Sequence, residues 1–435
     1  MFSKILIANR GEIAVRIIRA CREMGIKTVA VYSEPDADAL HTVLADEKVC
    51  VGSAASRDSY LNFKNVISAA VSTGVQAIHP GYGFLSENPE FAKMCRDYGI
   101  VFIGPPADVI SRMGNKTSAI SLMKRIGVST VPGSDALRDS SAALSEAEKI
   151  GYPLLVKAEA GGGGKGIRLV RSPEELVPAV ETAAKEAQAA FGNPNVYLEK
   201  FLTSVRHIEI QILADAFGNL ITLGERDCSL QRNKQKVIEE TPSPVISPEL
   251  REKMCASARR AAEAAGYVNA GTVEFLLDGD GNYYFIEMNT RLQVEHGVTE
   301  EMCGIDLVKW QIRIASRVPM SIKQEEIKIA GSAIECRINA KSAGQVNFLH
   351  LPASPGVRVD TALYTGCSVQ AFYDSMIAKV ITRAPTRAEA LRKMEAALCE
   401  LIIDGIPTNI KDQLALIRNE NFIVNNYDTD FLNRL

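Results

Sequence analysis

The segment of residues 271–295, GTVEFLLDGDGNYYFIEMNTRLQVE, constrains the fold more than any other part of the chain. Two short apolar and aromatic runs flank residues 278–282, DGDGN, and an acidic, glycine-rich turn between such runs is a strong hairpin signal. With Asp280-Gly281 as the tight turn, Glu274 pairs directly opposite Glu287. The segment therefore predicts two antiparallel strands that carry acidic side chains.

The acidic side chains of this predicted hairpin can meet on one face. Side chains alternate along a strand, so Glu287 and Asn289 share a face. Like charges directly opposite each other destabilise a sheet by roughly 0.2–1 kcal/mol, so Glu274 and Glu287 favour a bound cation. Oxygen ligands favour Mg²⁺ or Mn²⁺. A surface hairpin with solvated acids is the alternative. The side chains that continue this face, if the extended run persists, are Arg291, Gln293 and Glu295.

The composition narrows the class of protein. A length of 435 residues predicts two to four domains, and 46% hydrophobic with 23% charged residues is typical of a soluble globular protein. The net charge of -3 gives no reason to expect nucleic-acid binding, and no apolar run is long enough to predict a membrane span. The nine cysteines form no Cys-x-x-Cys pair. They favour reduced thiols in a cytoplasmic protein.

Residues 1–114 alternate strand and helix, which predicts a doubly wound parallel sheet. Only Gly11 follows the first strand, so a dinucleotide-binding glycine motif is absent. Residues 79–88, HPGYGFLSEN, follow a later strand and contain glycines, an aromatic residue and a carboxylate. Ligands bind at the carboxyl ends of such strands, so this loop is a candidate site segment. A purely structural turn is the alternative.

A smaller α/β unit is expected from about residue 130 to 203. The strand of residues 152–158 carries Lys157, and the glycines of residues 161–166, GGGGKG, precede another strand. This order differs from a Walker loop and predicts a hairpin flap, mobile without ligand, whose N–H groups cover phosphates. The strand of residues 196–202 can offer backbone donors and acceptors to an adenine ring.

Several charged residues of the central region are candidates for binding an anion. Lys116 begins a helix, where the helix dipole disfavours a cation unless an anion is near. His207 and Glu209 are two positions apart on one predicted strand, so their side chains face the same side. The charge-dense stretch of residues 225–240 places Arg232, Lys234 and Lys236 at alternate positions of an extended run, as an anionic substrate would need. A solvated loop is the alternative for this stretch.

Beyond about residue 330 the pattern changes to short strands and one late helix, residues 387–401. We expect a small α+β domain docked on the central part. A strand of residues 332–340 carries Arg337, which is either a site residue or a plain cation at a sheet edge.

Together these motifs resemble biotin carboxylase, a member of the ATP-grasp ligases, over residues 2–425. The resemblance implies an α/β and α+β multidomain chain. Its parts are an N-terminal doubly wound domain (1–114), a central ATP-grasp domain (115–329) with a mobile glycine-loop lid (about 131–203), and a C-terminal α+β domain (330–435). The motifs that carry it are ANRGEIAVRIIRA (8–20), HPGYGFLSEN (79–88), MGNK (113–116), GGGGKG (161–166), ERDCSLQR (225–232), QKVIEE (235–240), EFLL and FIEMNTRLQVEH (274–296), ECRINA (335–340) and YDSMIAK (373–379).

The resemblance also implies a reaction, the carboxylation of biotin by bicarbonate with MgATP, and a role for each matching residue. The implied ATP contacts are Lys116, Lys157, Gly163, Gly164, Glu199, Lys200, Leu202, His207, Lys234, Glu274 and Glu287. Two Mg²⁺ or Mn²⁺ ions would be held by Glu274, Glu287 and Asn289, and bicarbonate by Lys236, Arg291 and Val294. Glu295 would be the general base, Arg337 and Tyr82 would contact biotin, and the implied catalytic set is Arg291, Glu295, Lys236 and Arg337.

Three departures from the family pattern bear on these roles. Lys234 stands where the family often has His, Gly297 replaces the usual Pro of His-Pro-Val, and the segment between residues 339 and 356 is shortened. No Met-Lys-Met biotin-attachment motif is present. We therefore expect a separate subunit, a homodimer, that acts on a biotin carboxyl carrier protein beside carboxyltransferase subunits. Acetyl-CoA carboxylase is the expected context, and another acyl-CoA or pyruvate carboxylase, or a different ATP-grasp ligase, is the alternative.

Overall fold

The N-terminal part of the chain is a five-stranded parallel sheet covered by helices, as the strand and helix alternation predicts. The computed structural model describes residues 1–137, 140–159 and 167–435, so the predicted nucleotide contacts Gly163 and Gly164 lie outside the described residues. The strand order β3-β2-β1-β4-β5 is that of a doubly wound sheet. Its strands are β1 (Lys4–Ile7), β2 (Lys27–Ser33), β3 (Glu47–Gly52), β4 (Ala77–His79) and β5 (Val101–Phe102), and its helices are α1 (Gly11–Glu23), α2 (Leu40–Leu44), α3 (Phe63–Thr73), α4 (Pro89–Asp97) and α5 (Ala107–Gly114).

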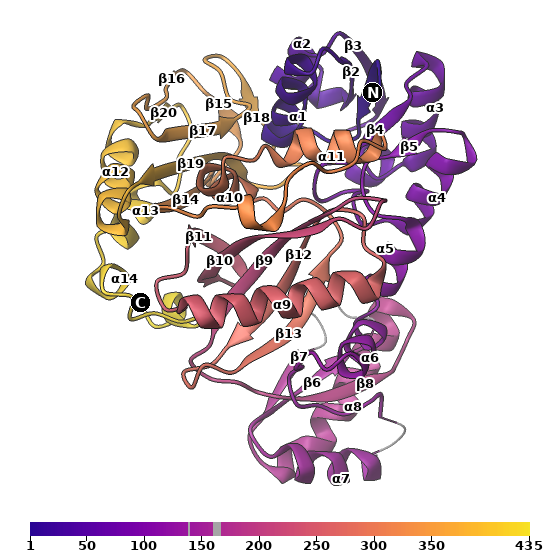
Figure 1. Ribbon diagram of the computed structural model, residues 1–435, viewed down its shortest axis with the longest axis vertical. Coiled ribbons are helices and arrows are strands. Elements are labelled where there is room, and N and C mark those ends of the chain that lie inside the picture. The colour runs from indigo at the N-terminus through magenta and orange to yellow at the C-terminus, as the bar shows by residue number, and fades with distance from the viewer. Residues whose placement is uncertain (138–139, 160–166) are drawn as a thin grey trace.

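A second unit projects from one end of the molecule, at the bottom of Figure 1. Its three strands are antiparallel in the order β7-β6-β8, and α7 and α8 pack on them. The hairpin of β6 and β7 confirms the strand–loop–strand arrangement predicted around the glycine segment. The elements are α7 (Ser140–Ile150), β6 (Leu154–Ala158), β7 (Ile167–Val170), α8 (Pro173–Phe191) and β8 (Val196–Lys200).

An eight-stranded antiparallel sheet forms the centre of the molecule, with the strand order β13-β12-β9-β10-β11-β14-β19-β17. The pairing of β11 with β14 joins strands from either side of residue 330. The predicted C-terminal α+β part is present. It is not a separate domain docked on the central part, because its strands β14, β19 and β17 continue the central sheet. The strands are β9 (Arg206–Ala214), β10 (Leu220–Arg232), β11 (Gln235–Thr241), β12 (Asn269–Leu277), β13 (Tyr283–Asn289), β14 (Ser332–Asn339), β17 (Val357–Thr361) and β19 (Met376–Ala384).

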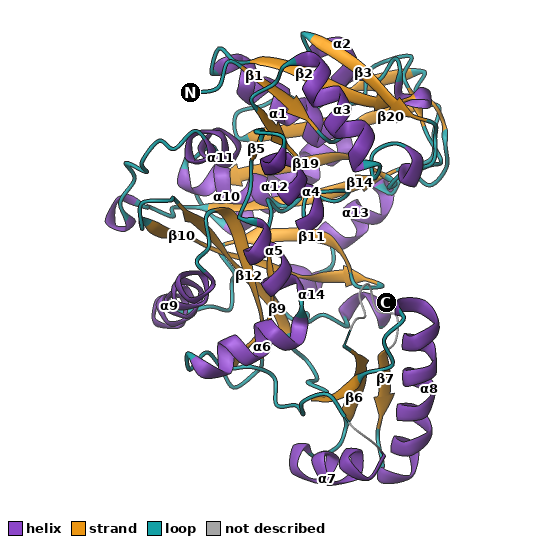
Figure 2. Ribbon diagram, turned by 90° about the vertical axis from the view of Figure 1, so that its right-hand side faces the viewer, coloured by secondary structure: helices purple, strands orange, loops and turns teal. Residues whose placement is uncertain are grey.

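Helices cover both faces of this sheet (Figure 1, Figure 2). Helix α9 packs on β9 and β10, and it begins where the sequence indicates, because the Ser247 side chain accepts a hydrogen bond from the Leu250 N–H. Helix α10 packs against β10, β11, β14 and β19. These helices are α6 (Lys116–Arg125), α9 (Pro248–Ala265), α10 (His296–Cys303) and α11 (Leu307–Ala315). Within the described part of the chain, every helix is too short or too polar to span a lipid bilayer.

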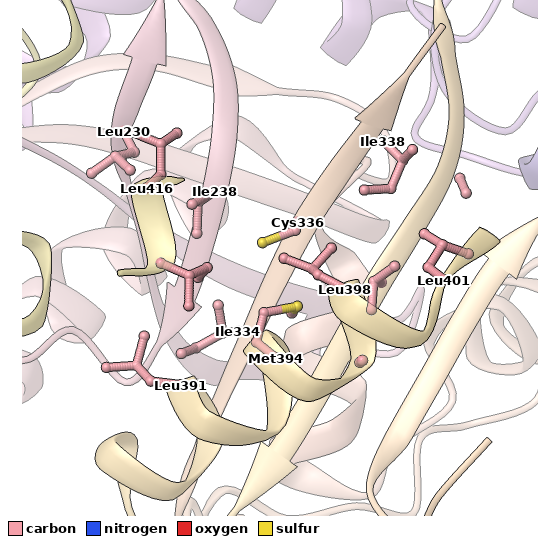
Figure 3. Close-up of a cluster of buried hydrophobic side chains, with 14 of the residues drawn as sticks. Leu230, Ile238, Ile334, Cys336, Ile338, Leu391, Met394, Leu398, Leu401 and Leu416 are labelled. Atoms are coloured by element: carbon pink, nitrogen blue, oxygen red, sulfur yellow. The ribbon is translucent and has the colours of Figure 1, made fainter. Parts of the chain in front are cut away.

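The C-terminal helices complete an apolar core with the far end of the sheet. Figure 3 shows Leu391, Met394 and Leu398 of α12 against Ile334 and Cys336 of β14. The remaining elements are β15 (Gly344–Gln345), β16 (Phe348–His350), β18 (Ser368–Val369), α12 (Arg387–Glu400), β20 (Ile402–Asp404), α13 (Ile410–Ile417), α14 (Glu420–Ile423) and the 3₁₀ turns η1 (Glu34–Asp36), η2 (Ser56–Asp58), η3 (Gln324–Glu326) and η4 (Phe431–Asn433).

The hairpin of β12 and β13 has the predicted register at its acidic residues but a different turn. The Asp278 N–H donates to the Asn282 carbonyl at 2.9 Å, so the loop has three residues instead of two. Gly281 has a φ of +84°, the left-handed conformation that such a loop requires. A bulge beside Glu274 adds one residue to the opposite strand, and Glu274 still pairs with Glu287.

The alternating cations predicted on one extended run do not lie on one strand. Strand β10 ends at Arg232, and β11 begins at Gln235. Asn233 and Lys234 both have positive φ values, 52° and 64°, and form the two-residue turn between these strands. Lys234 is therefore at the tip of a hairpin, while Lys236 lies on strand β11.

Candidate active site

One cavity of about 840 Å³ lies where the N-terminal part, the central strands and the C-terminal strands meet. Its lining includes Tyr82 from the N-terminal part and Arg337 from β14. It therefore brings together eleven of the residues predicted from the sequence, namely Tyr82, His207, Lys234, Lys236, Glu274, Glu287, Asn289, Arg291, Val294, Glu295 and Arg337.

Glu274 and Glu287 lie opposite each other on adjacent strands, but their negative charges are balanced by different numbers of nearby cations. Glu274 lies 3.0 Å from His207 Nε2 and 3.2 Å from Lys236 Nζ, while Glu287 has only Lys116 Nζ at 3.9 Å among the described residues. Burial and the nearby Glu274 raise the pKa of Glu287. The pKa of Glu274 stays below its usual range although burial opposes this, because Lys236 and His207 stabilise the charge.

This pair of acids, with an amide beside it, has the donor set of a divalent-cation site. Asn289 donates from Nδ2 to Glu274 Oε1 at 2.8 Å, which brings its side chain beside the carboxylates. The possible ligand atoms are the carboxylate oxygens of Glu274 and Glu287 and the amide oxygen of Asn289, which here accepts a hydrogen bond from Arg291, and Mg²⁺ or Mn²⁺ prefers such oxygen ligands. A bound cation would supply the positive charge that Glu287 lacks. The residues therefore fit the predicted metals.

Lys236 connects three buried carboxylates at the centre of the cavity. Its Nζ lies 2.6 Å from Glu209, 3.2 Å from Glu274 and 2.5 Å from Glu295. Burial opposes its charge, but the carboxylates raise the pKa of Lys236 well above its ordinary value. Lys236 is therefore a cation that lines the cavity and stays protonated.

Glu295 lies between two cations. Its side chain is 1% exposed, Lys236 approaches one carboxylate oxygen, and Arg337 approaches the other at 2.9 Å. The pKa of Glu295 falls well below its usual range although burial opposes this, because Lys236 and Arg337 favour the charged form. Arg337 also donates from Nε to Glu239 at 2.6 Å. Glu295 is therefore an ionised carboxylate held in place by two cations.

Arg291 is held by a carboxylate from the N-terminal part of the chain. Its Nε donates to Glu87 Oε2 at 2.9 Å, its Nη1 to Gln293 at 2.8 Å and its Nη2 to Asn289 at 3.2 Å. Glu87 also accepts the Thr290 N–H at 3.0 Å. The sequence placed Glu87 in a candidate loop but not as the partner of Arg291, because the contact joins residues 204 positions apart.

A buried arginine contacts Glu209, the carboxylate that also binds Lys236. Sequence reasoning missed this arginine as well. Arg226 is fully buried and donates to Glu209 at 2.5 Å and to Gln211 at 2.7 Å. The sequence signal was the charge density of residues 225–240, which also suits a solvated loop. The structure buries Arg226 in β10 but leaves Arg232 and Lys234 exposed, so the solvated alternative is wrong for Arg226.

The predicted nucleotide contacts of the projecting unit lie apart from the cavity. Among the described residues, the lining of the cavity does not include Lys157, Glu199, Lys200 or Leu202, nor does it include Lys116 of α6. Lys157 forms an ion pair with Glu199, and Lys200 donates to the backbone carbonyl of Tyr152 at 2.9 Å. Burial, then Lys157 and Lys116, lower the pKa of Lys234. Lys116 and Lys157 thus lie close enough to Lys234 to disfavour its charge, an arrangement that favours an anion beside Lys234.

Comparisons with known proteins find relatives along nearly the whole chain. Family models match three consecutive parts: "Biotin carboxylase, N-terminal domain" over residues 1–110, "Carbamoyl-phosphate synthase L chain, ATP binding domain" over 115–323, and "Biotin carboxylase C-terminal domain" over 335–434. Biotin carboxylase 1 of Bacillus subtilis (strain 168) is 54% identical over 442 residues, which cover 99% of this chain and 98% of that protein.

Solved structures show the same fold. A biotin carboxylase–beta-gamma-ATP complex from Campylobacter jejuni has a TM-score of 0.97 and 46% identity, and the match covers 100% of this chain and 99% of that chain. The Hydrogenobacter thermophilus 2-oxoglutarate carboxylase biotin carboxylase domain dimer, with MgADP and bicarbonate, has a TM-score of 0.94 and 47% identity, covering 100% and 98%. The chain belongs to the biotin carboxylase family, the enzymes that carry out the ATP-dependent carboxylation of biotin.

Proposed function

We propose that this chain carboxylates biotin on a biotin carboxyl carrier protein, with bicarbonate as the source of carbon and ATP as the activating agent. The observation that supports this most is the ionised Glu295 held between Lys236 and Arg337 in the cavity that also contains Glu274 and Glu287. We divide the chain at residues 114 and 329, with the lid at about 131–203.

The nucleotide would lie between the projecting unit and the central sheet. Its phosphates would be bound by Lys116, Lys157 and Lys234, and an anion there would offset the repulsion that Lys234 experiences from the other two lysines. The other proposed contacts are His207, Glu199, Lys200, Leu202, Gly163 and Gly164. Two Mg²⁺ or Mn²⁺ ions held by Glu274, Glu287 and Asn289 would offset the charge that develops on the transferred phosphoryl group.

Bicarbonate would bind beside Glu295, held by Lys236, Arg291 and the Val294 backbone. Glu295 would remove the bicarbonate proton as the bicarbonate oxygen attacks the terminal phosphorus, which yields carboxyphosphate and ADP. A carboxylate with a strongly lowered pKa is a weak base. Bicarbonate binding at Lys236 would add a fourth anion to the three carboxylates that contact this cation, and the added negative charge would raise the proton affinity of Glu295.

Biotin would reach the same cavity from the side of Arg337 and Tyr82. Carboxyphosphate breaks down to CO₂ and phosphate, and the phosphate can take the proton of the ureido nitrogen. Arg337 would stabilise the oxyanion of the deprotonated ureido group, because a guanidinium forms strong charge-assisted hydrogen bonds. Closure of the lid would keep water from carboxyphosphate.

We infer the partners from the same family pattern. The chain would act as a homodimer beside carboxyltransferase subunits, with acetyl-CoA carboxylase as the context. A biotin carboxylase subunit of pyruvate carboxylase is 50% identical with a TM-score of 0.87, so another carboxylase is the second candidate. All nine cysteines are free, which suits a reducing, cytoplasmic compartment.

ADP release by the purified chain tests the proposal. We expect release with MgATP to depend on bicarbonate, and to rise further when free biotin is added. ADP release that is equally fast after bicarbonate has been removed would contradict the proposed reaction.

A further inference from the structure

A second buried lysine, Lys379, contacts the backbone beside the proposed base. Lys379 lies on β19 and is 0% exposed. Its Nζ donates to the Val294 carbonyl oxygen at 2.7 Å. Val294 directly precedes Glu295, and both residues line the cavity. A charge-assisted bond to this carbonyl restricts the orientation of the peptide that joins them.

The same lysine joins the three parts of the chain. Its Nζ lies 3.3 Å from Glu12 Oε1 of α1 in the N-terminal part and 3.9 Å from Asp360 Oδ2 of β17. Val294 belongs to the central part. One side chain from the C-terminal part thus contacts the N-terminal helix and the loop that carries the base.

The surroundings keep Lys379 charged. Burial opposes the charge, but Glu12, Glu335 and Asp360 raise the pKa of Lys379 above its ordinary value. A protonated amine has three donors and no acceptor, so it can serve the Val294 carbonyl and a carboxylate at the same time.

We propose that Lys379 is a positioning residue for the carboxylation reaction: by holding the Val294 carbonyl, it orients the Val294 backbone and the Glu295 carboxylate toward bicarbonate. This inference rests on the proposed function. It concerns bicarbonate and not the nucleotide, because the contact is on the Val294–Glu295 peptide and not on the lysines around Lys234.

Two variants separate positioning from charge balance. Lys379→Met removes the bond and leaves Glu12 without its cation, so it lowers both stability and activity. The double variant Lys379→Met with Glu12→Gln removes this pair of charges and recovers part of the lost stability, while Asp360 keeps its ion pair with Arg358 at 2.7 Å. We expect the double variant to keep a KM for bicarbonate raised roughly 10- to 100-fold, the effect of losing one hydrogen bond from a charged donor. The KM for MgATP should stay within about twofold of wild type.

A matched control is available in the same part of the chain. Lys393 also donates to backbone carbonyls, those of Pro355 at 2.7 Å and Arg383 at 3.0 Å, but it is not among the described residues that line the cavity. Lys393→Met should leave the KM for bicarbonate unchanged. Should the Met variants of Lys379 fail to fold, Lys379→Arg keeps the charge but moves the donors. It should raise the same KM.

The outcomes are distinguishable from a failure of the proposed function. Wild-type chain that releases ADP independently of bicarbonate would contradict the proposed function itself. The role of Lys379 alone would be overturned if ADP release by the wild type depends on bicarbonate but the double variant, or Lys379→Arg, has the wild-type KM for bicarbonate. In that case the lysine merely balances the charge of Glu12.

Discussion

Glu274 and Glu287 lie directly opposite each other on β12 and β13, although the loop that joins these strands is one residue longer than a tight turn. The bulge beside Glu274 restores the pairing. Two acids directly opposite each other, of which Glu274 is buried and Glu287 partly exposed, destabilise a sheet unless a cation compensates their charges. The bulge therefore keeps Glu274 opposite Glu287, a pairing that the stability of the sheet alone does not explain. This pairing is the structural basis of the proposed metal site.

Glu287→Lys should abolish turnover and leave the fold near native. The Glu287 side chain is 38% exposed, so the lysine can be accommodated, but its charge occupies the position of the proposed cation. We expect bicarbonate-dependent ADP release to fall at least about 100-fold, with the thermal unfolding midpoint within a few degrees of wild type. Glu148→Lys, which changes an exposed acid on α7, is the control. ADP release by Glu287→Lys at the wild-type rate would refute the metal assignment.

Arg337→Lys should separate the two halves of the reaction. The guanidinium contacts Glu239 and Glu295 at once, which an ammonium on a flexible chain reproduces poorly. We expect biotin carboxylation to fall roughly 10- to 100-fold, while slow ADP release without biotin changes less. Equal losses of both rates would show that Arg337 serves the first step and not the ureido group.

Glu87→Gln should weaken bicarbonate binding through Arg291. The Glu87 side chain is 39% exposed, so the ion pair is partly screened and the expected rise in the KM for bicarbonate is only a few-fold. Glu90→Gln is the control, because Glu90 is an exposed acid in the first turn of α4, outside the loop that carries Glu87. A KM equal to that of wild type in Glu87→Gln would show that Arg291 is oriented by Gln293 and Asn289 alone.

The pH dependence of stability should change in Glu12→Gln. Burial raises the pKa of Glu12 to about 7, although Lys379 acts in the opposite direction. Between its ordinary value of 4.5 and about 7, the folded chain holds a proton that the unfolded chain has lost. This contribution to stability is therefore complete below about pH 4.5 and is lost as the pH rises through 7.

Thermal unfolding at pH 5 and pH 8 measures this effect. The wild-type midpoint should fall between the two pH values by a few degrees more than the midpoint of Glu12→Gln. Burial also raises the pKa of Glu239 to about 7, so part of the fall in the unfolding midpoint should remain in both proteins. An identical decline in wild type and variant would show that Glu12 does not take up a proton in this range.

Local patterns were enough to predict much of the fold. The parallel N-terminal sheet, the glycine-segment hairpin and helix α9 each depend on periodicity, turn residues or a capping serine within one short segment. The opposition of Glu274 and Glu287 was also predicted, although from a two-residue turn that the chain does not form.

The features that the sequence did not predict depend on distant contacts or on unusual backbone conformations. Lysine gives no signal for the left-handed conformation of Lys234. The pairing of β11 with β14 joins strands about 95 residues apart, and no local pattern encodes such a partner. The contact of Glu87 with Arg291 likewise requires the N-terminal part to pack against the central sheet.

Transfer of labelled carbon from bicarbonate to free biotin, measured with MgATP for wild type and Glu295→Gln, tests the central claim most directly. The account predicts labelled biotin with wild type and a loss of about 100- to 10,000-fold in the variant, the range for removing a general base. Equal labelling by the two proteins, or no labelling by wild type while ATP is cleaved, would contradict it.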